Sequence, residues 1–94
     1  MSLFPEALGR DEREIALLFT AELPKKVLVH NAYTTGWEHG ASDYRPGTRF
    51  YDTMRELEVL HTYEQGKKAG RRARRRAWRA AKRLEETEAH WADR

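Results

Sequence analysis

The sequence predicts a small all-α protein, a helical bundle or hairpin with a short N-terminal helix and one long basic C-terminal helix. The chain has 94 residues, 39% of them hydrophobic and 35% charged, so it can bury one modest core. After Pro46 it contains no proline and is dominated by Ala, Arg, Glu and Leu, which favour helices. Small and apolar residues recur at steps of three and four. We expect a single helical domain over residues 1–94, with 1–10 and 89–94 as frayed ends.

Two shorter helices are expected before the long one. Asp11 followed by Glu14 has the spacing of a capping box, and the apolar run 15–23 behind it predicts a short, well-buried helix that Pro24 ends. The next apolar run, from residue 25, is compatible with a strand or a helix. Steps of three and four downstream favour a helix over about 25–40, and these positions are Val29, Ala32, Tyr33, Gly36, Trp37 and Gly40.

A polar loop separates these helices from the third. Residues 41–47 contain Asp43, Pro46 and Gly47, which all favour turns. No cluster of helix-breaking residues follows, so we expect one unbroken helix over about 50–88. Its packing seam is made mostly of small residues, which lets a partner helix approach closely and makes a homodimer an expected state. The seam positions are Tyr63, Gly66, Gly70, Ala73, Ala77, Ala80 and Leu84.

One short pattern occurs twice in the chain. The segments beginning at Tyr33 and Tyr63 both read Tyr-x-x-Gly-x-x-x-Gly, thirty residues apart. One interpretation is that two antiparallel helices cross at these glycines, Gly36, Gly40, Gly66 and Gly70, with the tyrosines packed beside the crossing. The other is that the glycines leave bare backbone for a phosphate or base, while Tyr33, Trp37 or Tyr63 provides a stacking surface. The two interpretations are compatible.

Charge is strongly segregated along the chain. Residues 1–66 carry seven basic and eleven acidic side chains, whereas residues 67–83 carry ten basic side chains and no acid. The ten are Lys67, Lys68, Arg71, Arg72, Arg74, Arg75, Arg76, Arg79, Lys82 and Arg83. Like charges at this density repel one another on a helix. The run has three possible explanations: it binds a nucleic acid, it faces an acidic surface of a partner or of the same fold, or it is simply solvated. A nucleic acid is favoured.

Trp78 lies inside the basic run. With Arg74, Arg75 and Arg79 as helical neighbours, it is suited to stacking on a base. The alternative is that it covers the apolar seam beside Ala77.

Catalytic and metal-binding patterns are absent from the sequence. No His-x-x-His, His-x-x-x-His or His-Glu-x-x-His motif occurs, and the nearest cluster, Glu38, His39 and Asp43, is interpreted as the polar end of a helix. Neither Ser2 nor Ser42 has the surroundings of a nucleophile. We therefore expect no enzyme activity, no cofactor and no metal.

The composition also predicts the cellular setting. No run approaches the roughly 18 consecutive apolar residues of a membrane-spanning helix. The segment 1–6 lacks the features of a signal peptide, and the chain has no cysteine. We expect a cytoplasmic protein that does not interact with membranes.

The repeated segments also carry a resemblance to a known family. The stretch 31–40, the Pro-containing loop and the stretch 63–70 together resemble the ribosome modulation factor family, short basic proteins with Ala-x-x-x-Gly-aromatic-x-x-Gly and aromatic-x-x-Gly elements. The matching positions are Tyr33, Gly36, Trp37, Gly40, Tyr63 and Gly66. In the loop, Pro46 precedes Gly47, where the family has an aromatic residue. The resemblance implies two linked helices that bind small-subunit ribosomal RNA and silence translation by promoting ribosome pairing.

These features lead to one favoured function and one alternative. The favoured function is non-enzymatic RNA binding, by a ribosome-binding modulator that uses the basic run for phosphates and aromatic residues for stacking. The alternative is a small phage or mobile-element inhibitor, of the anti-CRISPR kind, that binds a host protein or ribonucleoprotein complex through charged surfaces.

Overall fold

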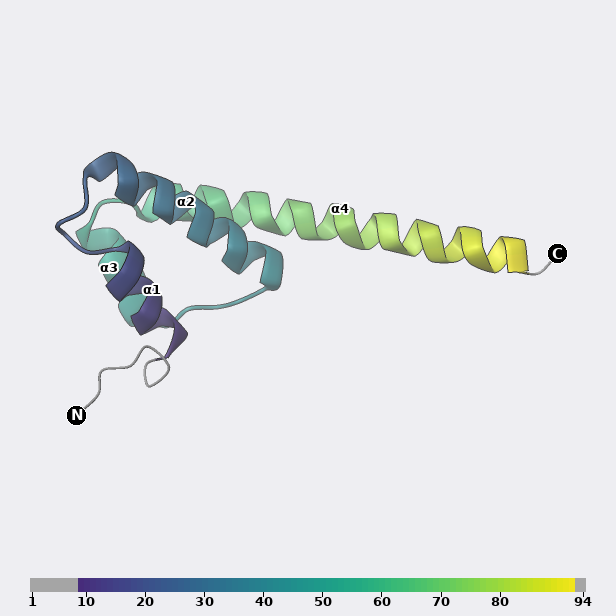
Figure 1. Cartoon of the computed structure of the whole chain (residues 1–94), viewed down its shortest axis with the longest axis horizontal. Helices are drawn as coiled ribbons and strands as arrows, with labels where there is room; N and C mark the ends of the chain where they lie inside the picture. The colour runs from purple at the N-terminus through teal and green to yellow at the C-terminus, as the bar shows by residue number, and fades with distance from the viewer. Residues whose placement is uncertain (1–8, 93–94) are drawn as a thin grey trace.

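The computed structural model describes residues 9–92, and the described chain contains four helices and no strand. They are α1 (Arg10–Leu18), α2 (Lys25–Ser42), α3 (Thr48–Glu56) and α4 (Leu60–Ala92). Helices α2 and α4 lie side by side, α1 and α3 cover one end of this pair, and α4 continues far beyond it (Figure 1). The all-α fold class and the long C-terminal helix are therefore confirmed. None of these helices has a stretch apolar and long enough to span a bilayer.

The ends of the chain lie only partly within the described residues. The frayed ends expected at 1–10 and 89–94 fall outside them at 1–8 and 93–94. Within them, Arg10 begins α1, and α4 remains helical to Ala92.

Helix α1 begins earlier and ends earlier than the sequence predicts. It starts after Gly9 with no side-chain cap, so the capping box expected at Asp11 and Glu14 is wrong. It also ends at Leu18, well before Pro24, and none of its residues is fully buried. The apolar contribution of this segment comes mainly from Phe19, which follows the helix and is buried in the core.

The two carboxylates of α1 make tertiary contacts instead of capping the helix. Asp11 accepts hydrogen bonds from the Tyr44 hydroxyl at 2.5 Å and from the Gly47 N–H at 2.7 Å, which hold the loop after α2 against α1. The bond to Asp11, together with burial, raises the pKa of Tyr44 to about 12.

The unbroken helix expected over 50–88 is wrong, because the chain turns between α3 and α4. Glu58 adopts a left-handed conformation with φ 60°, and the Val59 N–H donates to the Met54 carbonyl at 2.9 Å. This bond and the burial of both Met54 and Val59 are the features of a Schellman motif. Lys25, at the start of α2, donates from Nζ to the Glu58 carbonyl at 3.2 Å and so ties this turn to α2.

Helices α2 and α4 run parallel, so the antiparallel crossing considered above is wrong. Gly36 and Gly40 face the backbones of Tyr63 and Lys67, while Gly66 and Gly70 face those of Tyr33 and Trp37. Residue numbers increase in the same direction on both helices along this contact. The two copies of Tyr-x-x-Gly-x-x-x-Gly therefore meet face to face in equivalent positions, and each glycine touches the other helix's backbone.

The hydrophobic core lies at the end of the pair that α1 and α3 cover. Its fully buried members are Phe19, Leu28, Ala32, Phe50, Met54, Val59 and Tyr63. The Phe50 ring packs against Tyr63 with centroids 5.1 Å apart and against Phe19 edge-on at 5.8 Å. Because α3 supplies Phe50 and Met54, the segment that joins the parallel helices is itself part of the core.

A buried polar chain joins α1, α2 and α4 inside this core. His39, which is fully buried, contacts the Tyr63 hydroxyl through Nδ1 at 2.7 Å and Glu14 through Nε2 at 2.7 Å. Because a carboxylate only accepts hydrogen bonds, Nε2 is a donor. Glu14 accepts a further bond from Arg10 Nε at 2.8 Å. Burial raises the pKa of Tyr63, and neighbouring Tyr51 adds to this, so its hydroxyl stays neutral.

Beyond Gly70 the seam predicted on α4 has no helix beside it. Ala73 is half-buried, and Ala77, Ala80 and Leu84 are exposed. In the monomer, α2 therefore packs against only the first half of the seam. The predicted homodimer remains a prediction.

Gly66→Ala should destabilise the protein, although alanine is the better helix former. A Cβ at Gly66 would lie 2.1 Å from the Tyr33 carbonyl oxygen, and backbone cannot rotate away as a side chain can. The helices must then separate, and we expect the free energy of unfolding to fall by about 1 to 3 kcal/mol. Urea denaturation followed by circular dichroism measures this. An unchanged or increased free energy of unfolding would contradict the close contact.

Ala77→Leu is the matched control on the same helix. Because Ala77 is exposed in the monomer, the added methylenes should leave the free energy of unfolding within about 0.5 kcal/mol of wild type. Sedimentation velocity of both proteins tests the homodimer at the same time. If the chain pairs through this face, the wild type sediments as a dimer and the variant shifts toward monomer.

Acid should weaken the fold through Glu14. Burial alone would raise the pKa of this carboxyl, but hydrogen bonds from His39 and Arg10 outweigh it and lower the pKa below its usual 4.5. The contribution of Glu14 is therefore present above about pH 4.5 and is lost as the pH falls through the lower, folded-state pKa. Glu14→Gln should be less stable than wild type at neutral pH and lose less stability on acidification. Glu22→Gln, at an exposed position outside the helices, is the control and should be as stable as wild type at neutral pH.

Candidate nucleic-acid interface

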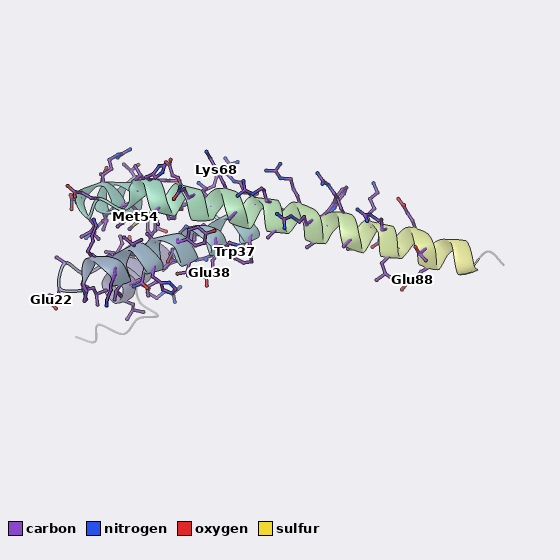
Figure 2. The ribbon with its side chains drawn as sticks, turned by 90° about the horizontal axis from the view of Figure 1, so that it is seen from above. Glu22, Trp37, Glu38, Met54, Lys68 and Glu88 are labelled. Carbon is purple, nitrogen blue, oxygen red and sulfur yellow. The ribbon has the colours of Figure 1, made fainter. Side chains whose placement is uncertain are left out.

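The ten cations of residues 67–83 all lie on α4, and most of them lie on the part that extends beyond α2. With about 100° between successive residues, all ten positions fall within about half of the helix circumference. The remaining side carries Ala69, Gly70, Ala73, Ala77, Ala80, Ala81 and Leu84. Side chains tipped with nitrogen follow the exposed length of α4 in Figure 2. We call this half of the helix surface, from Lys68 to Arg83, the cation band.

Lys67 belongs to the fold and is left out of the cation band. Its Nζ donates to the Tyr51 hydroxyl at 2.8 Å and lies 5.5 Å from the centroid of that ring. The same Nζ lies 6.0 Å from the centroid of Tyr63. These contacts hold α4 against α3, so Lys67 is a packing residue.

The acidic surface of the fold does not cover the cation band. Among the side chains that the structure describes, Arg74 is the only one of the ten within ion-pair distance of a carboxylate, at 3.8 Å from Asp43. Arg74 is 56% exposed, so this contact is solvated and contributes little to stability. Carboxylates of the same fold therefore neutralise very little of the positive charge of the cation band.

A hollow of about 440 Å³ lies where the cation band meets the end of α2. Its walls are Asp43, Arg71, Arg74, Arg75, Trp78 and Arg79. Trp78 is 62% exposed, so its ring is available to a ligand. We call this space the Trp78 hollow. A second space of about 310 Å³ lies farther along α4 and is lined by Trp78, Arg79, Lys82, Arg83 and Glu86.

Asp43 enters the Trp78 hollow because of how α2 ends. Its φ of 56° is left-handed, and the next N–H, of Tyr44, donates to the His39 carbonyl at 2.8 Å. This turn places the carboxylate beside Arg74. From the sequence, Asp43 is a turn former and a member of the polar cluster at the end of a helix. No local signal relates it to Trp78, which is 35 positions away and meets it only through the parallel helix pair.

The other predicted stacking residues have different surroundings. Tyr63 is fully buried and bonded to His39, so it is closed to any ligand. Tyr33 and Trp37 are about two-fifths exposed, at 42% and 41%, and lie on α2, where their backbones contact Gly66 and Gly70 of α4. Figure 2 shows Trp37 on α2 beside α4. Neither lines the Trp78 hollow. The four glycines contact backbone and leave no room for a base.

The Glu38, His39 and Asp43 cluster does not form a metal site. The side chain of His39 faces Glu14 and Tyr63 in the core, whereas Glu38 and Asp43 are exposed. Within the described part of the chain, no three His, Asp or Glu side chains are grouped closely enough to hold a metal ion.

Comparison with known proteins gives no relative from which a role could be transferred to these residues. No family model, no curated protein and no solved structure matches the chain.

Proposed function

We propose that this chain is a non-enzymatic RNA-binding protein that modulates translation by binding the ribosome. The observation that carries the RNA-binding part is the cation band, which is exposed along a helix that extends away from the fold and is almost without counter-charges. An extended row of cations matches the regular charge of a phosphate backbone. Seven of the ten cations on residues 67–83 are arginines, whose guanidinium groups bind phosphate oxygens in pairs and also stack on bases.

The choice of the ribosome rests on the resemblance to ribosome modulation factors. In this structure, the glycines of the shared pattern hold α2 against α4. The pattern thus supports a scaffold that presents α4, and the cations of α4 supply the RNA contacts. A protein partner with an acidic surface is the competing target, and the experiment below separates the two.

Reversing two charges of the cation band should weaken RNA binding without unfolding the chain. In Arg75→Glu/Arg76→Glu, both residues are exposed, and neither is paired with a carboxylate among the described side chains. Because each phosphate contact contributes about 0.7 to 0.9 to the slope of log affinity against log salt, we expect a shallower slope and at least about tenfold weaker binding at low salt. Fluorescence anisotropy with a small-subunit ribosomal RNA fragment measures both.

The matched control is Lys26→Glu/Arg49→Glu, which changes net charge equally at exposed sites on α2 and α3, outside the cation band. Its slope should remain that of the wild type, and its affinity should change far less. RNA affinity that is equal in both double variants would contradict the proposal. If wild type binds no RNA but recovers a protein from a nuclease-treated lysate, the acidic-partner alternative replaces RNA binding.

A further inference from the structure

We propose that the Trp78 hollow is a site for one unpaired nucleotide, whose base stacks on the Trp78 ring while its phosphate lies between Arg75 and Arg79. This inference rests on the proposed RNA binding and deepens it, because it makes single-stranded RNA the preferred ligand. The volume of about 440 Å³ falls within the range of small-molecule sites. A stacking surface beside cations is also how proteins commonly hold single-stranded nucleic acids.

Only one face of the Trp78 ring is free. Lys82 Nζ lies 5.0 Å from the ring centroid, as in a cation–π contact. Lys82 lines the second space and not the Trp78 hollow, so it covers the face of the ring that is turned away from the hollow. The face turned toward Asp43 and Arg71 is open to a base.

Charge around the hollow sets the direction of the nucleotide. Asp43 stands on the Arg74 side, where its carboxylate and the carbonyl end of α2 repel a phosphate. By helix geometry, Arg75 and Arg79 lie on the opposite side of Trp78 from Arg74. The phosphate therefore lies at Arg75 and Arg79, and the base points toward Asp43, whose oxygens accept hydrogen bonds from base amino groups or ribose hydroxyls.

A base inside a duplex cannot use this site. Both of its faces already stack on neighbouring base pairs, and side chains do not enter the deep, narrow major groove of duplex RNA. The cation band alone would bind duplex and single strand by charge. Trp78 therefore adds affinity for unpaired segments only, such as loops, bulges and ends.

Trp78→Ala tests the site, with labelled RNA followed by fluorescence anisotropy. The probes are an unstructured single-stranded RNA, its duplex with the complementary strand, and an abasic strand of equal length. We expect about 5- to 150-fold weaker binding to the single strand, corresponding to the loss of one stacked base, and less than about twofold change on the duplex and abasic probes. Trp78→Phe should recover part of the affinity. The loss should persist at high salt, unlike that of Arg75→Glu/Arg76→Glu, because stacking releases no counterions.

Leu84→Ala is the control, since Leu84 is equally exposed on α4, at 61%, and lies outside the Trp78 hollow. It should bind all three probes as wild type does. Trp78 makes no contact with the core cluster, so its alanine variant should keep the helical signal of the wild type. Equal losses on the three probes, or no loss on any, would overturn the nucleotide site and leave RNA binding standing. If the wild type binds none of the probes, the proposed function itself fails.

Discussion

The structure depends on the direct contact between the backbones of α2 and α4. Two glycines on each helix lie against the backbone of the other helix. Each glycine within a helix costs about 1 kcal/mol relative to alanine. Close approach offsets this cost, because each of the four glycines faces a carbonyl oxygen of the other helix, where dispersion and Cα–H to carbonyl contacts are favourable. Since the paired helices run parallel, the chain must return along their length before α4 begins. That return segment contains α3, so the core residues Phe50 and Met54 are held in place by the same crossing.

The length of α2 decides where the charge of α4 becomes exposed. Helix α2 ends at Ser42, opposite Gly70, and the core lies entirely toward the other end of the pair. Of the two cations before this point, Lys67 packs against Tyr51, whereas Lys68 is exposed and already belongs to the cation band. Those after it face solvent, apart from the distant contact between Arg74 and Asp43. The boundary between the packed scaffold and the proposed binding surface therefore follows from the end of α2, and the Trp78 hollow lies at that boundary.

The sequence predicted the face by which the two helices meet but not their direction. A Tyr-x-x-Gly-x-x-x-Gly face is the same for parallel and antiparallel partners, and the direction follows from the connection between them. The break at Glu58 also left no local signal, because neither glycine nor proline occurs there. Burial of Met54 and Val59 and the tertiary bond from Lys25 stabilise that turn.

Side-chain roles that depend on distant contacts were the least predictable. Asp11 and Glu14 have capping-box spacing, yet their partners are Tyr44 and His39, which lie on other parts of the fold. By contrast, the cation band could be located from the sequence, because exposure of a continuous charge run on a helix requires no knowledge of tertiary structure. The position of Asp43 beside Trp78 could not be predicted from the sequence, because only the parallel crossing brings the end of α2 to that turn of α4.

Binding of the proposed RNA ligand to the cation band would also stabilise α4. Arginines follow one another at steps of four along it, at Arg71, Arg75, Arg79 and Arg83, and each such pair opposes the helix by a few tenths of a kcal/mol. No core offsets this repulsion beyond Gly70, because the side chains from 74 to 88 are exposed. Backbone hydrogen bonds and the helix propensity of Ala and Arg maintain this part of α4. A bound polyanion removes the repulsion and so stabilises the helix that binds it, by the linkage that any ligand of the folded state obeys. Charges that destabilise the isolated chain would therefore become favourable in the proposed complex, which is the physical argument for a polyanion as the ligand of this helix.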